Sequence, residues 1–436
     1  MPDALHARGV GAGSAADGAF GLSDRLPPVH RDPQYQRLWM LGILVGLIRW
    51  VEILAFAVFT YEHTQSELWV ASLMMLRMLP LALFGLSLGA LAARMSRRKL
   101  MLALHVLVGG VSVGLLLLSI FAQVEVWHLA AASVLGGLLW ASDMPLRRGL
   151  IGDIAGPVRM AQAMSLDSVA SSACRLLGPG LGGLLLAQAG LPAVFSCSVL
   201  LYLLALFALW RFREPEGAPK PAEQLLVGVL AGGLQAARES PRLRAVLCLT
   251  ILFNLFAWPV MSMVPVIGQE SLKLDPQGVG LLASVDGVGA VLGSLVLSFG
   301  AARLPHGRLY LGAIVTFMVL QMLMAWSPYL LLTAAALLLL GAAQTAFGVM
   351  QSTLVYTAAP EHRRAQAMGL MTMCIGASPL GFLAVGALAQ RLGAPGATLV
   401  CAVCGLLAVA LIWPMCRACW REPISAQAQA SASALP

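Results

Sequence analysis

An internal repeat constrains the architecture of this chain more than any other feature. Ala161-Gln162-Ala163-Met164 recurs 204 residues later as Ala365-Gln366-Ala367-Met368. Two further matches lie at nearly the same offset: Leu186-Ala187-Gln188 with Leu388-Ala389-Gln390, and Ala92-Ala93-Arg94 with Ala301-Ala302-Arg303. An offset near half of the 436 residues predicts two equivalent halves. In a membrane protein, such parallel repeats form two bundles related by an axis along the membrane normal.

The composition places both halves in a membrane. Hydrophobic residues make up 59% of the chain and charged residues only 11%, where a soluble domain carries roughly 25% charge. A mean hydropathy of +0.83 agrees with this, and a soluble globular protein is excluded. We expect twelve all-α membrane spans, each long enough to cross a ~30 Å hydrocarbon core. They are 39–60, 68–92, 100–122, 127–147, 162–187, 191–211, 244–268, 277–301, 308–326, 329–352, 367–390 and 395–416.

Basic residues set the orientation of these spans. Of the 28 Lys and Arg residues, three lie within spans (Arg49, Arg77 and Arg175) and two in loops of the opposite side (Lys273 and Arg391). The others gather at the ends of the even-numbered spans and in the tails. The positive-inside rule then places both termini in the cytoplasm of a multi-pass inner-membrane protein. The net charge of +8 is therefore explained by orientation in the lipid bilayer. We expect no nucleic-acid partner.

The polar segments divide the chain into five parts. We expect a disordered cytoplasmic tail over 1–37, a six-helix bundle over 38–212, a linker over 213–242, a second six-helix bundle over 243–417 and a tail over 418–436. The N-terminal tail lacks the apolar core of a signal peptide, so we expect the first span to act as the insertion signal. In the linker, Leu225, Leu226, Val229 and Leu230 have helical spacing, which predicts an amphipathic cytoplasmic helix. The alternative is a flexible linker.

The cysteines and the remaining polar residues do not indicate chemistry. Cys401-x-x-Cys404 and Cys416-x-x-Cys419 resemble a zinc pattern, but on one helix the pairs lie ~22 Å apart and cannot surround one ion. We interpret them as packing cysteines and expect no metal. The chain has no catalytic triad pattern and no phosphate-binding Gly-Lys-Ser/Thr loop, so we expect neither an enzyme nor a cofactor.

The loop after the second span carries a known signature. It runs from Gly89 to Lys99 and includes Arg94, Arg97 and Arg98. This loop resembles the signature of the major facilitator superfamily, a glycine, then Leu-Ala-Asp-Arg, then a second glycine and a basic run. Here Ala93 replaces the acidic residue and Ser96 the second glycine. The acidic residue usually helps to hold the two bundles together on the cytoplasmic side. The alternative is that the basic run serves only as a topology signal.

The fifth span points to a branch of that superfamily. It contains Arg175-Leu176-Leu177-Gly178-Pro179-Gly180-Leu181-Gly182-Gly183. Gly178-Pro179 is expected to break and bend the helix, while Gly178 and Gly182 allow a neighbouring helix to approach closely. The segment resembles the fifth-helix motif of exporters; a generic packing kink is the alternative. Together with Tyr35–Trp39, Leu76–Pro80, Pro157–Met164 and Pro360–Gly369, it resembles the enterobactin-exporter and macrolide-efflux branch across residues 35–418.

Charged residues inside spans are costly and therefore usually functional. Glu52 and Asp286 are our first candidates for proton coupling: Glu52 is three residues from Arg49 and can pair with it, and Asp286 has no basic neighbour in sequence. Asp167, four residues before Ser171 and eight before Arg175, and Asp143, four residues before Arg147, are the next candidates. For each, the alternative is a structural ion pair that holds helices together.

The resemblance implies that spans one, four, seven and ten line a central cavity. The candidates for contact with a substrate are Arg49, Trp50, Trp140, Phe253, Asn254, Trp258, Gln344, Phe347 and Gln351. Aromatic and amide side chains suit a bulky amphiphilic ligand. The alternative is that many of these residues only pack helices together.

These observations predict a monomeric secondary transporter with two six-helix bundles that exports an amphiphilic small molecule, such as a siderophore or a drug, against proton entry. A lipid or lysolipid flippase, an importer of the same fold and a membrane receptor or scaffold that does not transport are the alternatives.

The predicted orientation can be tested with a thiol reagent that does not cross membranes. In intact cells the reagent should leave Cys419 unmodified, because that residue lies on the cytoplasmic side. A Gln123→Cys variant, placed in a predicted outer loop, should react. Modification of Cys419 from outside, measured by mass spectrometry, would reverse the predicted orientation.

Overall fold

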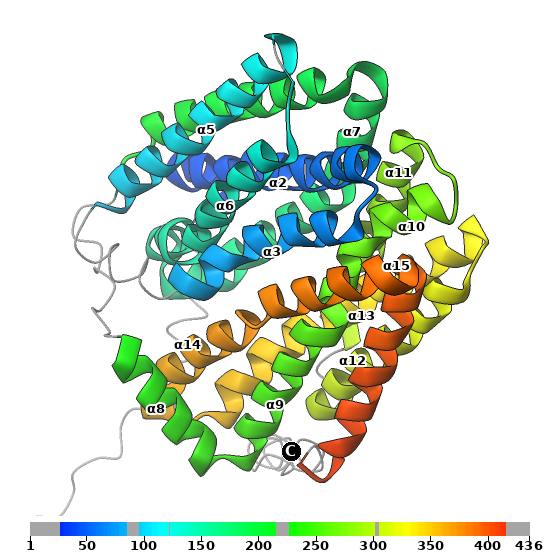
Figure 1. Cartoon of the computed structure of the whole chain (residues 1–436). Coiled ribbons are helices and arrows are strands. Elements are labelled where there is room, and N and C mark those ends of the chain that lie inside the picture. The colour runs from blue at the N-terminus through cyan, green and yellow to red at the C-terminus, as the bar shows by residue number, and fades with distance from the viewer. Residues whose placement is uncertain (1–26, 85–95, 122, 215–225, 301–304, 416–436) are drawn as a thin grey trace, which may run out of the picture.

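The computed structural model describes residues 27–84, 96–121, 123–214, 226–300 and 305–415. These ranges are almost entirely helical, as the sequence predicts (Figure 1). Gly89 and Arg94 of the predicted loop signature lie outside the described residues, and so do Cys416, Cys419 and the predicted C-terminal tail.

Five α-helices and one π-helical turn form the N-terminal half. They are α2 (Pro33–Thr64), α3 (Glu67–Phe84), α5 (Arg97–Phe121), α6 (Val126–Asp143), the π-helix η2 (Met144–Arg148) and α7 (Gly149–Arg211). The long helix α7 contains non-helical backbone angles at Gly156, Ala189 and Gly190. It therefore includes both the fifth and the sixth predicted spans, which meet at Gly190.

The C-terminal half repeats this plan. Its elements are α8 (Leu226–Glu239), α9 (Pro241–Leu252), η3 (Phe253–Ala257), η4 (Trp258–Met263), α10 (Val264–Glu270), α11 (Pro276–Gly300), α12 (His306–Trp326), α13 (Leu330–Ala358), η6 (Glu361–Arg363), α14 (Arg364–Ile375) and α15 (Ser378–Leu411). Helix α15 has non-helical angles at Gly393, where the eleventh and twelfth predicted spans meet.

The two turns explain one of the sequence matches. Within the part of the chain that the structure describes, ten helical segments are long and apolar enough to cross a membrane. Two of these, Gln162–Arg211 and Glu361–Leu411, are 50 and 51 residues long and hold two spans each. Gly190 and Gly393 adopt φ of 67° and 71°, a conformation that favours glycine. Proline follows two residues later in both halves. The repeated Leu-Ala-Gln thus directly precedes the sharp turn of each half.

The repeated Ala-Gln-Ala-Met has an equivalent place in both halves. Gln162 accepts a hydrogen bond of 3.2 Å from the backbone N–H of Val29, in the segment that leads into α2. Its counterpart Gln366 packs against Gly232 of α8, the helix that leads into α9, and a Cβ at Gly232 would overlap the Gln366 amide. In each half, this glutamine therefore contacts the segment that enters the first span.

The segment that leads into α2 becomes helical at an earlier residue than the sequence suggested. A short 3₁₀ turn covers Val29–Arg31 and α2 begins at Pro33, so the prediction of disorder through residue 37 is wrong for this part. Asp32 caps the helix by accepting from the backbone N–H of Gln34 at 2.8 Å, an interaction that stabilises helix N-termini. The Tyr35 hydroxyl donates to the Ala163 carbonyl at 3.0 Å.

The described end of the loop signature is held by specific partners. Arg97 forms ion pairs with Asp153 at 2.5 Å and with Glu214 at 3.5 Å, and Arg98 donates to the last carbonyls of α7, those of Leu209 and Trp210. Burial would raise the pKa of Glu214, but hydrogen bonds from Ser96 and the backbone N–H of Arg98, with the charge of Arg97, lower it overall. The basic run therefore anchors the start of α5 to the end of α7.

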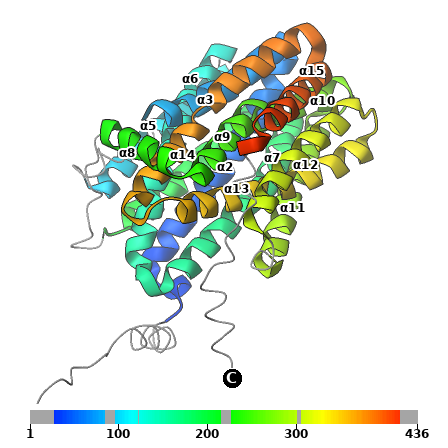
Figure 2. The same ribbon diagram turned by 90° about the horizontal axis from the view of Figure 1, so that it is seen from below.

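The two halves meet along α7 with α11 and along α3 with α15 (Figures 1 and 2). At the first of these seams, a Cβ at Gly183 would lie 2.9 Å from the Cα of Gly280. At the second, a Cβ at Gly386 would lie 2.7 Å from the Cβ of Ala71. Both close approaches lie toward the end of the molecule that carries the turn at Gly190, which we name the Gly190 end. The opposite end, where α8 lies, is named the α8 end.

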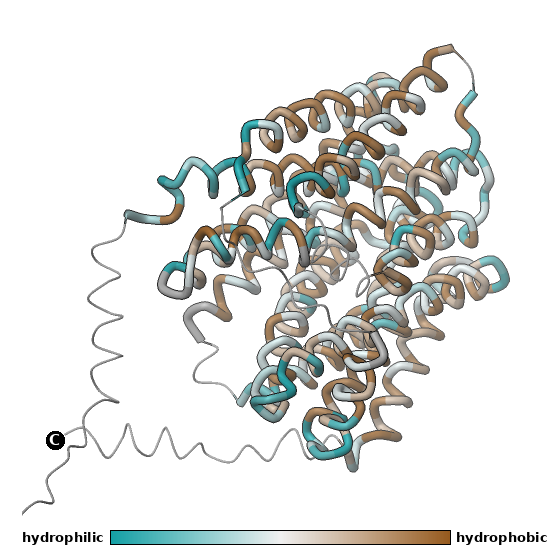
Figure 3. Tube along the Cα trace, turned by 90° about the vertical axis from the view of Figure 1, so that its left-hand side faces the viewer, coloured by the Kyte–Doolittle hydropathy of each residue, from teal (hydrophilic) through white to brown (hydrophobic). Residues whose placement is uncertain are grey.

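Hydrophobic residues predominate along the helices (Figure 3). Large hydrophobic side chains such as Phe121, Leu331 and Leu411 are exposed on it. Exposed apolar side chains around paired buried charges suit a lipid bilayer.

The exporter-like segment of α7 packs closely but does not break the helix. The backbone stays helical through Gly178 and Pro179, so the predicted break is wrong, and the non-helical angles lie at the ends of the span instead. A Cβ at Gly178 would overlap the Cβ of Trp50, and one at Gly182 would lie 2.7 Å from the Val51 carbonyl oxygen. These two glycines therefore let α7 lie directly against α2.

Substitution at Gly178 should test this contact. In Gly178→Val the side chain meets Trp50 and must displace α2 from α7, so transport should fall at least tenfold while membrane abundance persists. Gly110→Val is the matched control, because a Cβ at Gly110 has nothing within 4 Å. Normal transport by the Gly178 variant, at equal abundance on immunoblots, would show that this contact does not matter for function.

Candidate functional site

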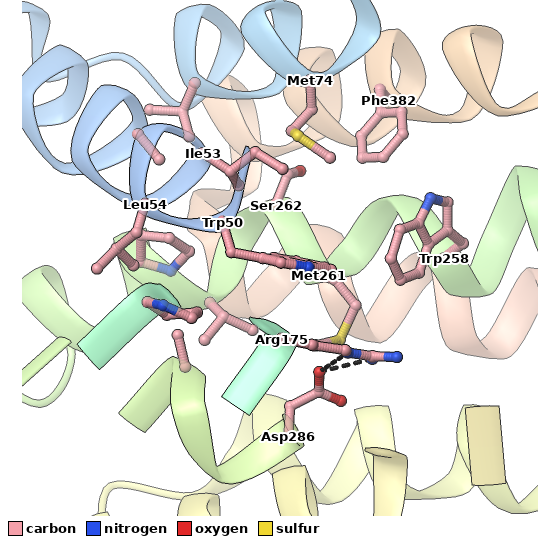
Figure 4. Close-up of a pocket in the computed structure, with 16 residues that line it drawn as sticks. Trp50, Ile53, Leu54, Met74, Arg175, Trp258, Met261, Ser262, Asp286 and Phe382 are labelled. Atoms are coloured by element: carbon pink, nitrogen blue, oxygen red, sulfur yellow. Dashed lines mark hydrogen bonds and ion pairs between the residues drawn. The ribbon is translucent and has the colours of Figure 1, made fainter. Parts of the chain in front are cut away.

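A cavity lies between the two halves (Figure 4). Residues of both halves line it: Trp50, Ile53 and Leu54 from α2, Met74 from α3, Arg175 and Pro179 from α7, Trp258, Met261 and Ser262 from η4, Asp286 from α11 and Phe382 from α15. Most of these side chains are apolar, aromatic or sulfur-containing, which suits a loosely held amphiphilic ligand. The polar groups are the pair Arg175–Asp286 and the Ser262 hydroxyl.

The seventh span changes its helical type where it reaches the cavity. After α9 it continues as the π-helix η3 and the 3₁₀-helix η4, and it returns to α-helix only at Val264. The irregular turn frees the carbonyl of Ala257, which accepts a 2.7 Å hydrogen bond from the Gln321 amide. Such departures from α-helix frequently mark functional sites. Here the irregular turn presents Trp258 and Met261 to the cavity.

An ion pair joins the two halves at the cavity. Nη2 and Nε of Arg175 in α7 lie 2.6 Å and 2.7 Å, respectively, from Oδ2 of Asp286 in α11. Arg175 also donates to the side-chain oxygen of Gln344 in α13. The expectation that Asp286 has no basic partner is therefore wrong: its partner comes from the other half, 111 residues away in sequence. The other carboxylate oxygen of Asp286 is buried without a hydrogen-bond partner among the described residues.

Glu52 has a different partner from the one that sequence spacing suggested. Its carboxylate lies 3.2 Å from Arg77 of α3, and both side chains are buried. The predicted pair between Arg49 and Glu52 is not formed, because the two side chains diverge from α2 toward different neighbouring helices. Arg77 also lies 5.8 Å from the ring of Phe56. Glu52 and Arg77 thus form a neutral pair inside the N-terminal half and do not line the cavity.

The other two carboxylates share a compact cluster. Arg147 binds Asp143 at 2.6 Å, as the spacing predicts, and also Asp167 at 2.5 Å. Arg148 approaches Asp167 at 2.9 Å. Both arginines lie on the π-helix η2, whose wider turn directs them toward α7. Asp167 and Arg175, predicted to form one stripe with Ser171, therefore have separate partners on separate helices.

Arg49 differs from these arginines. Its guanidinium carbon lies 4.4 Å above the ring of Trp140 in α6, a cation–π distance. Among the described residues, no carboxylate lies within salt-bridge distance of Arg49. Both side chains remain partly accessible.

The remaining candidates for cavity lining pack inside the C-terminal half. Phe253 stacks on Phe347 with ring centroids 3.8 Å apart. The Asn254 amide donates to the Thr250 carbonyl, and the Gln351 amide donates to the Thr250 hydroxyl. These four predicted residues, Phe253, Asn254, Phe347 and Gln351, are buried. They pack helices in this conformation, whereas Trp50 and Trp258 line the cavity as predicted.

Sequence analysis missed several features of the site. Ser262 and Phe382 line the cavity but have no signal that separates them from ordinary core residues. Arg77 did have a signal, since a lone cation in a membrane span requires a buried partner. Pro259 and Pro265 in the seventh span also indicated an irregular helix. Within the described ranges, no group of three or more His, Cys, Asp or Glu residues is placed to hold a metal ion.

The fold and the site define a twelve-span transporter with a cavity between its halves, and comparison with known proteins identifies the family. Residues 25–434 match the major facilitator family described as "Transmembrane secretion effector". The chain belongs to this family and is a multi-pass membrane transporter rather than an enzyme.

Relatives confirm the efflux branch that the motifs predicted. The chain is 26% identical to the multidrug efflux pump Tap of Mycolicibacterium fortuitum over 370 residues, which cover 81% of this chain and 88% of that protein. It is 20% identical to macrolide efflux protein A of Streptococcus pyogenes over 268 residues, 61% of this chain and 66% of that protein.

A solved structure shows the same fold. A bacterial homologue of the human lysosomal transporter Spinster, in an inward-facing and unoccupied conformation, superposes with a TM-score of 0.70 at 15% identity and covers 90% of this chain and 99% of that chain. At this identity the likeness supports the fold alone.

Substitutions at Glu52 and Arg77 can test whether this buried ion pair stabilises the protein. Removing one member leaves a buried charge alone, which typically destabilises by about 3–5 kcal/mol. Arg77→Met should therefore lower the melting temperature and membrane abundance. The double variant Arg77→Met, Glu52→Gln should recover most of the loss, because no charge is then left unpaired. Equal thermal stability of the single variant and the wild type, measured in detergent, would contradict the buried pair.

Proposed function

We propose that this protein exports amphiphilic small molecules across the inner membrane by alternating access, in exchange for protons. The observation that carries the proposal is the ion pair Arg175–Asp286, which connects the two halves at an apolar cavity. A transporter of this fold works by moving one half against the other. A protonatable group located between the halves couples proton binding directly to that movement.

The direction of access follows from the seams and the predicted topology. The halves are in close contact toward the Gly190 end, and the positive-inside rule places the α8 end in the cytoplasm. The structure then corresponds to a state closed toward the outside. In this state a substrate enters from the cytoplasm, and export requires the seams α7–α11 and α3–α15 to separate.

Asp286 is better placed for coupling than Glu52. When Asp286 binds a proton, its carboxyl becomes neutral and loses its ionic attraction to Arg175, which weakens the seam between α7 and α11. Deprotonation restores the pair and closes the seam. The chemistry requires only that the proton is gained on one side of the membrane and released on the other. Glu52, Asp143 and Asp167 are paired within the N-terminal half, so their protonation does not act on this seam directly.

The lining of the cavity supports the substrate class. Trp50, Trp258, Met261 and Phe382 provide aromatic and thioether surface without a fixed array of hydrogen bonds. Such a surface accepts bulky molecules of varied shape. The names of two relatives, a multidrug efflux pump and a macrolide efflux protein, support export of drug-like amphiphiles. We further propose that the chain works as a monomer.

Coupling can be tested in everted membrane vesicles with erythromycin, ethidium and the anionic dye 8-anilinonaphthalene-1-sulfonate as probes. Wild-type protein should accumulate at least one of them when the lumen is acidic, and nigericin should abolish the accumulation. Asp286→Asn mimics the protonated carboxyl but cannot release a proton, so gradient-driven accumulation should be lost while downhill exchange survives. Glu125→Gln, an exposed carboxyl outside the cavity, is the control and should behave as wild type.

Two results would overturn this assignment. If Asp286→Asn still concentrates the probe under a pH gradient, Asp286 is not the coupling group. If Glu52→Gln alone abolishes accumulation, at equal abundance, coupling belongs to the pair inside the N-terminal half.

A further inference from the structure

Among the described residues, Arg49 has no carboxylate within ion-pair distance, and Asp143, which attracts it from further away, is bound by Arg147. Four carboxylates lie within the described spans near it, and each is held by another arginine: Glu52 by Arg77, Asp286 by Arg175, and both Asp143 and Asp167 by Arg147. Arg148 also forms an ion pair with Asp167. Arg49 is left without an ion-pair partner among the described residues.

A neighbouring aromatic ring fixes the position of this cation. The Arg49 guanidinium lies over the face of Trp140, 4.4 Å from the ring centroid. Stacking leaves the edge of the guanidinium, with its N–H donors, free to bind a planar anion in a bidentate manner. The ring thus holds the charge in place without neutralising it, which keeps the cation available for an anion.

Arg49 also lies beside the cavity. It directly precedes Trp50, which lines the cavity and packs against Gly178 of α7. Arg49 also lies four residues before Ile53 on α2, a second residue of the cavity lining. Its side chain is partly accessible, so a molecule that enters the cavity from the α8 end can reach it.

We infer that Arg49 and Trp140 form a subsite for the anionic group of a transported amphiphile, a carboxylate or a sulfonate, whose apolar part occupies the cavity lined by Trp50, Met261 and Trp258. An unpartnered cation inside a membrane protein is unfavourable, and an anionic substrate removes that penalty when it binds. The substrate class is therefore amphiphilic anions, in preference to neutral or cationic molecules of the same shape. This inference rests on the proposed function, since it names the substrate of the same cavity.

Two fluorescent probes of matched shape test the preference. 8-Anilinonaphthalene-1-sulfonate is anionic, and N-phenyl-1-naphthylamine has the same aromatic frame without the sulfonate. Binding of each is titrated against purified full-length protein in detergent, with a detergent blank subtracted. Wild type should bind the sulfonate more tightly than the neutral probe. In Arg49→Gln the affinity for the sulfonate should fall about tenfold while the affinity for the neutral probe stays within twofold.

Three further variants separate the subsite from general effects. Arg49→Lys keeps the charge but loses the planar fork, so it should recover part of the preference. Trp140→Leu keeps Arg49 but removes the ring that positions it, and it should weaken sulfonate binding alone. Lys273→Gln removes an exposed cation elsewhere and should change neither affinity. Elution as a single peak from a sizing column, with a melting temperature close to that of wild type, shows that each variant is folded.

An unchanged ratio of the two affinities in Arg49→Gln would overturn the subsite. Equal loss of both probes in a folded variant would also contradict it, because Arg49 would then shape the cavity rather than bind the anion. The titration uses no ion gradient, so its outcome is independent of proton coupling. A protein that prefers the sulfonate but fails gradient-driven transport would contradict the proposed function and leave the subsite intact.

Discussion

Neutralisation of charge in a medium of low dielectric is the constraint on which this structure depends. A lone charge at mid-membrane costs about 2.5–3.5 kcal/mol on insertion scales, and the carboxylates within the spans each meet an arginine. The pairs also decide which helices lie together: Glu52–Arg77 joins α2 to α3, Arg147–Asp167 joins η2 to α7, and Arg175–Asp286 joins the two halves. The helix arrangement and the candidate site thus follow from the same interactions.

Close packing at glycine residues is the second interaction that holds the helices together. Lipid surrounds the helices with a medium as apolar as their side chains, so helix association relies on close packing and polar contacts rather than on the hydrophobic effect. One side of α7 uses Gly178 and Gly182 against α2, and another uses Gly180 and Gly183 against α11, where the backbone N–H of Gly180 also donates to Ser284 at 2.9 Å. The exporter-like segment is therefore a two-sided contact that joins α2, α7 and α11, and this explains its high glycine content without a helix break.

The sequence predicted the fold well and the site only in part, for a physical reason. Span length, hydropathy and the repeat are properties of contiguous segments, so the twelve spans and two halves could be predicted. Pairing depends on how each helix is rotated about its axis, which no contiguous segment encodes. Arg49 and Glu52 share a helix face by spacing, yet Glu52 points to Arg77 of the next helix. Asp286 looked isolated because its partner, Arg175, lies in the other half. Phe253 and Phe347 have the composition of cavity residues, but they stack on each other inside the C-terminal half.

The charges are distributed unequally between the two halves, and this asymmetry bears on the mechanism. The N-terminal half holds Glu52, Asp143 and Asp167 with their arginines, whereas Asp286 is the single charged residue in the middle of the C-terminal spans. The two halves therefore differ in their buried charge although they share the repeat. The N-terminal half is braced internally by its own pairs and can move as one body. One carboxylate of the C-terminal half, Asp286, forms an ion pair across the seam between the halves. In the proposed function, its protonation weakens that seam and leaves the pairs inside the N-terminal half intact. Arg49 lies in the N-terminal half, and in the proposed subsite its charge binds a substrate anion while the internal pairs stay closed.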